Sequence, residues 1–185
     1  VQLNQTIDDD KFAYTPPDGV EVTDLSSISD PEPEDSDESP YNTKIKIGDV
    51  APEFEAPLLS GGKVKLSDYR GKVVLLDFWA KWCGPCMAEI PNLIEVYSEF
   101  HERGFDILGV NMDGSDASAK EVITEHPGMA WINVFEGEAW DSPVVVLYGV
   151  NAIPYTLLLD QGGKVIGRDL DRDALKSEIS RLLEE

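Results

Sequence analysis

Basic side chains are scarce in this sequence of 185 residues, which has 15 lysine and arginine residues against 36 aspartate and glutamate residues and a net charge of -21. Proteins that bind nucleic acid or anionic membrane surfaces use basic patches to displace counterions from those partners. A chain this acidic is poorly suited to either task. We therefore expect neither nucleic acid nor anionic lipid surfaces among its partners.

Cysteine is also rare, with two residues in the whole chain. Cys83 and Cys86 are separated by only two residues, and a bridge that closes so short a loop removes little entropy from the unfolded chain. With 42% apolar residues, the chain is long enough to build a core without such a bridge. A purely structural disulfide is therefore disfavoured.

Histidine is as rare as cysteine, and this bears on metal binding. A closed zinc site needs about four ligands, commonly two cysteine pairs or one pair with two closely spaced histidines. The sequence supplies one cysteine pair, and His101 and His126 lie far apart from each other. We therefore expect no metal site.

Long apolar runs are missing as well. No run reaches the roughly 18 apolar residues that a transmembrane helix requires. The sequence begins at Val1 without the basic and apolar regions of a signal peptide. We expect a processed chain or a fragment whose targeting segment lies outside it.

Residues 1–43 differ in composition from the rest, with 12 acidic residues and a single lysine. Residues 26–40 contain one apolar side chain among acids, serines and prolines, which is too little to offset the entropy of ordering. We expect residues 1–43 to form an acidic linker rich in proline and serine. Within it, DDKFAYTPPDGVEV (9–22) has a turn signal between apolar residues and resembles the end of a β domain of the lipoprotein-carrier kind, so a remnant of an upstream domain is expected.

From residue 44 to 185 the pattern is that of an α/β domain. Residues 72–80 are apolar except for one acid, as in a central strand buried on both faces. Residues 142–150 are ambiguous, because their β-branched run favours a strand while Ser142 and Pro143 make a good helix start, and we favour a helix. The other expected elements are two short strands around Gly61 and Gly62, a helix ending at Gly104, a strand over 105–113, a helix over 116–126, a short strand over 131–135, a hairpin turning at Gly162 and Gly163, and a last helix capped by Asp171.

The two cysteines fall between a predicted strand and a predicted helix, at the edge where open α/β sheets place their sites. A thiol attacks only as its thiolate, and the free N–H groups at the start of a helix stabilise a thiolate. If the helix starts at Cys83, this residue is the attacking thiol, and Cys86, one turn later, is its buried partner. We expect Cys86 to resolve the mixed disulfide that Cys83 forms with a substrate.

The stretch DFWAKWCGPC (77–86) resembles the active site of thioredoxins. Residues 47–83 and 148–167 are similar to the TlpA/ResA branch of thioredoxin-like thiol-disulfide oxidoreductases, which is related to the AhpC/TSA proteins, and the resemblance covers about residues 44–185. It implies an α/β thioredoxin-like fold in which helices flank a central mixed sheet, with a β-hairpin extension at the N-terminus. It also implies reversible dithiol/disulfide exchange with protein substrates, with no cofactor other than a redox-active disulfide between Cys83 and Cys86.

The resemblance assigns roles to further residues. Asp77 matches a buried acid, and burial raises the pKa of a carboxyl and suits it to exchanging a proton with Cys86. Glu89 matches an acid kept near the cysteines, although a glutamate on a helix face is more often simply solvated. Pro154 matches a cis-proline that faces the cysteines, which would leave the backbone of Ile153 to pair with a substrate strand. The residues expected to bind substrate are Trp79, Trp82, Gly84, Pro85, Ile153 and Pro154.

Departures from the family pattern leave two alternatives open. Thioredoxins place a lysine beside the buried acid, and this chain has Gly109 at the matching position, so its proton relay must differ. A peroxiredoxin-like peroxidase needs a Pro-x-x-x-Thr-x-x-Cys arrangement, which neither cysteine has. The other alternative is a non-catalytic binding module with a thioredoxin fold, and the intact CGPC sequence argues against it.

The dipeptide between the cysteines, Gly84-Pro85, is the one that thioredoxin has, and it favours a reducing role. By resemblance we expect a bacterial protein that works outside the cytoplasm, periplasmic or tethered to a membrane through a segment outside this chain. The expected partners are protein disulfide or dithiol substrates and an upstream electron donor. We expect a monomer.

Overall fold

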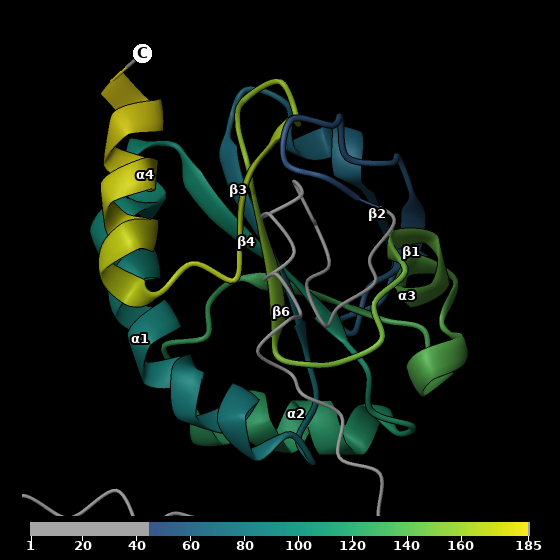
Figure 1. Cartoon of the computed structure of the whole chain (residues 1–185). Helices are drawn as coiled ribbons and strands as arrows, with labels where there is room; N and C mark the ends of the chain where they lie inside the picture. The colour runs from purple at the N-terminus through teal and green to yellow at the C-terminus, as the bar shows by residue number, and fades with distance from the viewer. Residues whose placement is uncertain (1–44, 185) are drawn as a thin grey trace, which may run out of the picture. The chain divides into compact units, whose positions relative to one another are not determined.

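A computed structural model describes residues 45–184 of the chain (Figure 1). The acidic linker expected over residues 1–43, with the remnant of an upstream domain, lies outside the described residues. Within 45–184, no helix combines the length and the apolar character needed to cross a membrane. The elements are β1 (Glu55–Pro57), β2 (Lys63–Lys65), β3 (Val73–Trp79), α1 (Gly84–Phe100), β4 (Phe105–Asn111), α2 (Asp116–Glu125), β5 (Ile132–Phe135), α3 (Pro143–Tyr148), β6 (Tyr155–Leu159), β7 (Val165–Arg168) and α4 (Arg172–Glu184).

The main sheet has five strands in the order β5-β4-β3-β6-β7. The central strand β3 runs parallel to β4 and antiparallel to β6, so the sheet is mixed. The strands β1 and β2 form a separate antiparallel hairpin ahead of it. This confirms the expected mixed sheet with helices around it and an N-terminal hairpin.

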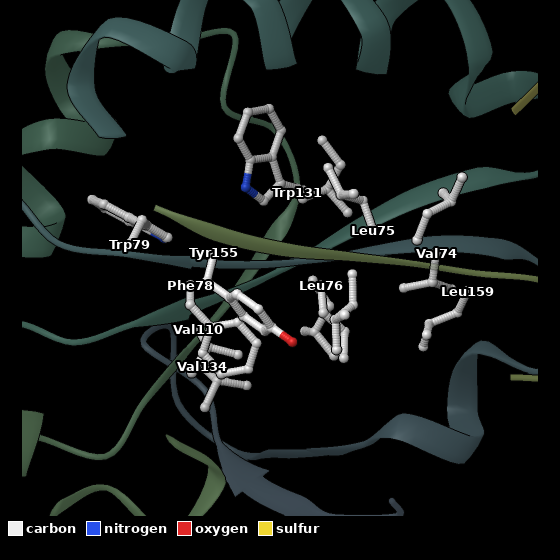
Figure 2. Packing of buried hydrophobic residues seen from close by; sticks show 14 of the residues in the cluster. Val74, Leu75, Leu76, Phe78, Trp79, Val110, Trp131, Val134, Tyr155 and Leu159 are labelled. Carbon is white, nitrogen blue, oxygen red and sulfur yellow. The ribbon is translucent and has the colours of Figure 1, made fainter. Parts of the chain in front are cut away.

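All seven residues of β3 are buried, as the apolar run predicted. Successive side chains of a strand point to opposite faces. Figure 2 shows Leu75 and Trp79 on one side of the sheet, and Leu76 and Phe78 on the other. Asp77 has the same parity as Leu75 and Trp79, so it shares their face.

Helices α1 and α4 lie side by side on one face of the sheet, and α3 with the β1–β2 hairpin lies on the other (Figure 1). The face under α1 and α4 is the one that carries Asp77, because Leu75, Val96 of α1 and Leu175 of α4 line one cavity with it. The helix that begins next to the cysteines therefore covers the buried acid of β3.

The local predictions largely agree with the structure. Gly104 adopts the left-handed conformation, with φ of 107°, after the short 3-10 turn that follows α1. The ambiguous residues 142–150 contain a helix that starts at Pro143, as we favoured.

Ser142 occupies the N-cap position of α3, as expected, but its hydroxyl makes no capping hydrogen bond to the helix. Its hydroxyl donates to the carboxylate of Glu136, and the same carboxylate accepts a hydrogen bond from the Val144 N–H at 3.1 Å. The acid reaches the helix start from the loop after β5. It supplies the side-chain acceptor that the Ser142 hydroxyl does not provide.

The cap of α4 gives a direct test of the fold. Asp171 Oδ1 accepts hydrogen bonds from the N–H groups of Asp173 and Ala174, at 3.1 and 2.9 Å. We predict that Asp171→Ala lowers the free energy of unfolding by about 1 kcal/mol in urea titrations, because two N–H groups lose their acceptor. The control Asp173→Ala removes an exposed acid from the same turn and should change stability much less. Equal losses in the two variants would contradict the assigned cap.

Candidate active site

The two cysteines lie at the start of α1, just after the loop that connects it to β3. Cys83 is the N-cap of the helix, and its Sγ accepts a hydrogen bond from the Cys86 N–H at 3.2 Å. The two residues are joined by a disulfide, with their Cα atoms 5.2 Å apart. Cys83 is 5% exposed and Cys86 is 4% exposed, so burial in this oxidised state does not distinguish attacking from resolving thiol.

The start of α1 provides the electrostatics that a thiolate needs. The Cys86 N–H already points at the Cys83 sulfur, and Pro85 lies in the first turn, where an N–H would have no partner within the helix. Gly84 and Pro85 are exposed, so the dipeptide between the cysteines faces solvent. A reduced Cys83 here would be stabilised as its thiolate.

The loop before the cysteines is clamped to the end of β4. The Lys81 N–H donates to both carboxylate oxygens of Asp113, at 3.2 and 3.0 Å, and the Met112 N–H donates to the Trp79 carbonyl at 2.8 Å. Asn111 Nδ2 in turn donates to Asp113 at 2.8 Å. Asp113 was not among the residues predicted for the site. The available signal was an acid two residues after a buried strand, at the same sheet edge as the cysteines.

A cavity of about 340 Å³ lies behind the cysteine pair. Asp77, Cys86, Glu89 and Pro154 all line it, although they come from β3, from α1 and from the loop before β6. The structure thus brings together four of the predicted site residues. Asp169, which was not predicted, also lines this cavity and holds the Thr156 N–H at 2.8 Å.

Asp77 is the most strongly perturbed acid of this cavity. It is 5% exposed, and none of the described residues donates a hydrogen bond to its carboxyl group. Burial raises the pKa of Asp77 from 3.8 to about 7, and the nearby charge of Glu89 adds to the effect. A carboxyl with such a pKa can both take up and release a proton near neutral pH.

Glu89 occupies a different environment at the mouth of the same cavity. Its side chain is exposed on α1, and Oε2 accepts a hydrogen bond from Asn92 Nδ2 at 3.2 Å. Because the residue touches both solvent and the cavity, it is placed to connect the two.

Gly109 lies directly opposite Asp77 in the register of β3 and β4. A Cβ atom at Gly109 would come far inside van der Waals contact with Asn133 Oδ1 and within 3.1 Å of Trp79 Nε1. Those two atoms are hydrogen-bonded to each other at 3.0 Å. The buried Trp79–Asn133 pair therefore occupies the space where a lysine beside the acid would have to pass.

The two predicted tryptophans are placed very differently. Trp79 is 1% exposed, so its side chain cannot touch a docked substrate in this conformation. Trp82 is 55% exposed and packs against Trp140, another residue that the sequence analysis did not single out.

Ile153 and Pro154 lie in the loop before β6, and the peptide bond between them is cis, as expected. Both residues are partly buried. Between residues 45 and 184, no group of three or more His, Cys, Asp or Glu residues is arranged to hold a metal ion.

Comparison with known proteins identifies the family. Residues 47–168 match the AhpC/TSA family. The chain belongs to this family. The thiol-disulfide oxidoreductase ResA of Bacillus thuringiensis is 31% identical over 140 residues, which cover 76% of this chain and 78% of the relative. ResA of Geobacillus thermodenitrificans is 37% identical over 123 residues, which cover 66% of this chain and 68% of the relative.

Solved structures of thiol-disulfide oxidoreductases resemble the described domain. The thioredoxin domain of a thiol-disulfide oxidoreductase from Bacteroides vulgatus has a TM-score of 0.69 at 32% identity, over 75% of this chain and 99% of that one. A thiol:disulfide interchange protein from a Bacteroides species has a TM-score of 0.66 at 31% identity, over 76% and 92% of the two chains. The protein is a thiol-disulfide oxidoreductase with a thioredoxin-like fold.

The buried acid predicts how stability depends on pH. In the unfolded chain Asp77 ionises near pH 3.8, whereas in the folded protein it stays protonated up to about pH 7. Between these values unfolding releases a proton, so rising pH favours the unfolded state by about 1.4 kcal/mol per pH unit. Relative to Asp77→Asn, the oxidised wild type should lose stability from pH 5 to pH 7 and no more above pH 8.

Urea unfolding of the two proteins at each pH measures this difference. The control Asp173→Asn removes the same charge from an exposed site. Its free energy of unfolding should change with pH in parallel with that of the wild type. If Asp77→Asn also runs parallel to the wild type, Asp77 does not carry the raised pKa.

Proposed function

We propose that the protein reduces disulfide bonds in other proteins by exchanging them with its own Cys83 and Cys86 thiols, with Asp77 as the proton acceptor for Cys86. One observation carries the proposal: a cysteine pair at the start of a helix shares a cavity with a buried acid whose pKa is raised to about 7. That arrangement supplies a stabilised thiolate at one sulfur and a proton acceptor behind the other.

The reaction begins with both cysteines reduced. The Cys83 thiolate attacks one sulfur of a substrate disulfide, that S–S bond breaks, and the departing substrate sulfur takes up a proton from water. A mixed disulfide now joins Cys83 to the substrate. The helix start favours this step because the Cys86 N–H is directed at the attacking sulfur.

Cys86 completes the exchange. It gives its proton to the Asp77 carboxylate and, as a thiolate, attacks the sulfur of Cys83, so that the second substrate sulfur leaves. The Cys83–Cys86 disulfide forms, the departing sulfur takes up a proton from water, and the substrate leaves with two thiols. Glu89, exposed at the mouth of the cavity, passes the proton from Asp77 to solvent. An upstream donor then returns two electrons to the pair.

Substrate contacts come from the exposed rim around the cysteines. Gly84, Pro85 and Trp82 are exposed there and can meet a substrate chain. The backbone of Ile153, next to Pro154, would pair with an extended substrate segment. Trp79 acts indirectly, because its buried indole is bound to Asn133 and fixes the strand that leads to the site.

The finer assignments rest on the CGPC sequence and on kinship with ResA. We propose a reducing direction, a monomer, and a place outside the bacterial cytoplasm, in the periplasm or on a membrane tether that lies outside this chain. Residues 1–43 would then be the acidic linker of that tether, with the remnant of an upstream domain, and residues 44–185 the catalytic domain.

Insulin reduction driven by a small thiol tests the proposal. Cys83→Ser should abolish catalysed turnover, because the attacking thiol is gone. Cys86→Ser should accumulate a mixed disulfide through Cys83, visible as a mass increase that dithiothreitol removes. Asp77→Asn should slow the release of product by about tenfold or more near pH 7 and leave mixed-disulfide formation nearly unchanged.

Three results would contradict the proposal in different ways. Trapping of substrate through Cys86 in a Cys83→Ser protein would reverse the two thiol roles. Catalysed consumption of peroxide without insulin reduction would identify a peroxidase. Binding of substrate without either activity would identify a non-catalytic module.

A further inference from the structure

Two tryptophans are exposed together beside the cysteine pair. Trp82, which directly precedes Cys83, is 55% exposed, and Trp140 is 41% exposed. Their ring centroids lie 5.9 Å apart with the planes tilted by 48°. Large aromatic residues on a surface lose the burial that normally stabilises them, so an exposed pair points to a binding surface.

The loop between β5 and α3 holds Trp140 in this place. Ala139, next to it, adopts the left-handed conformation with φ of 49°, which is unfavourable for a residue with a side chain. The Glu136 carboxylate ties the loop to the start of α3 through Ser142 and Val144, and the Asp141 N–H donates to the Glu138 carbonyl at 2.9 Å. The loop is thus built to present Trp140 rather than to bury it.

The immediate neighbours of Trp140 are acidic. Glu138 and Asp141, on either side of Trp140, are both exposed, and the whole chain carries a net charge of -21. A ligand that covers the two rings will therefore also meet carboxylates. The surface suits a segment that combines an apolar side chain with a basic one.

We propose that Trp140 is a specificity-determining residue that, together with Trp82, receives an apolar side chain flanking the disulfide of a protein substrate, with a lysine or arginine beside it. The inference rests on the proposed function, because it takes Cys83 as the sulfur that attacks. The occupant is an extended substrate segment. Its apolar side chain covers the indole rings while its disulfide lies over the neighbouring cysteine.

A pair of disulfide peptides tests this proposal. The two peptides have the same length and differ only beside the disulfide, where one carries Leu-Lys and the other Ser-Asp. The third substrate is bis(2-hydroxyethyl) disulfide, which is too small to reach the rings. We compare kcat/KM for four reduced proteins: the wild type, Trp140→Ala, Trp140→Phe and the control Ile132→Ala. Ile132 is a suitable control because it is an apolar residue on β5 that is 42% exposed.

Trp140→Ala should lower kcat/KM for the Leu-Lys peptide by about tenfold, mainly through KM, the size expected for losing one aromatic contact. The Ser-Asp peptide and the small disulfide should stay within about twofold of wild type, because neither uses the rings. Trp140→Phe should retain most of the preference, and Ile132→Ala should match wild type.

Other outcomes overturn the proposal. If Trp140→Ala slows all three substrates equally, Trp140 only supports the fold. If it slows none, the rings do not bind substrate. If the proposed function itself is wrong, the result differs from both of these, because the wild type will then fail to reduce bis(2-hydroxyethyl) disulfide.

Discussion

The burial of Asp77 in the middle of β3 is the constraint on which the rest of the site depends. A carboxylate in an apolar sheet is costly, and the structure meets that cost by keeping the group protonated up to about pH 7 and by opening a cavity next to it. Among residues 45–184 no cation lowers the pKa of Asp77, and the neighbouring strand has Gly109, with the Trp79–Asn133 pair filling the space beyond that glycine. Asp77 therefore changes its protonation state near neutral pH, where a carboxyl can exchange a proton with a thiol.

In the proposed mechanism the site divides into a chemical part and a recognition part that meet at the cysteines. Behind Cys86 lie the cavity, the buried acid and the solvent-exposed Glu89. In front of Cys83 lie the exposed dipeptide and the two tryptophans. Asp113 holds the loop that joins the two parts, because its carboxylate binds the backbone of Lys81. Proton transfer and substrate choice can therefore be altered by separate substitutions.

The sequence predicts the elements well because their signals are local. An apolar run broken only by Asp77 marks β3, paired glycines mark the two hairpins, and Asp171 precedes a regular apolar spacing in α4. The errors and omissions come from contacts between distant residues. The Glu136 carboxylate, not the Ser142 hydroxyl, accepts the hydrogen bond at the start of α3, Trp79 is buried with its indole bound to Asn133, and Trp140 reaches Trp82 from a loop more than fifty positions away. The cis bond before Pro154 was predicted from family resemblance, since most bonds of this kind are trans.

A redox titration of the Cys83–Cys86 pair tests the central claim most directly. The protein is equilibrated with dithiothreitol or glutathione buffers of known potential, and the fraction of free thiols is read by alkylation and mass. The account predicts one two-electron transition with a midpoint near that of thioredoxin, about -270 mV, because the proposed role of the CGPC pair is that of a reductant. A midpoint near the value of the oxidant DsbA, about -120 mV, or no reversible transition at all, would contradict it.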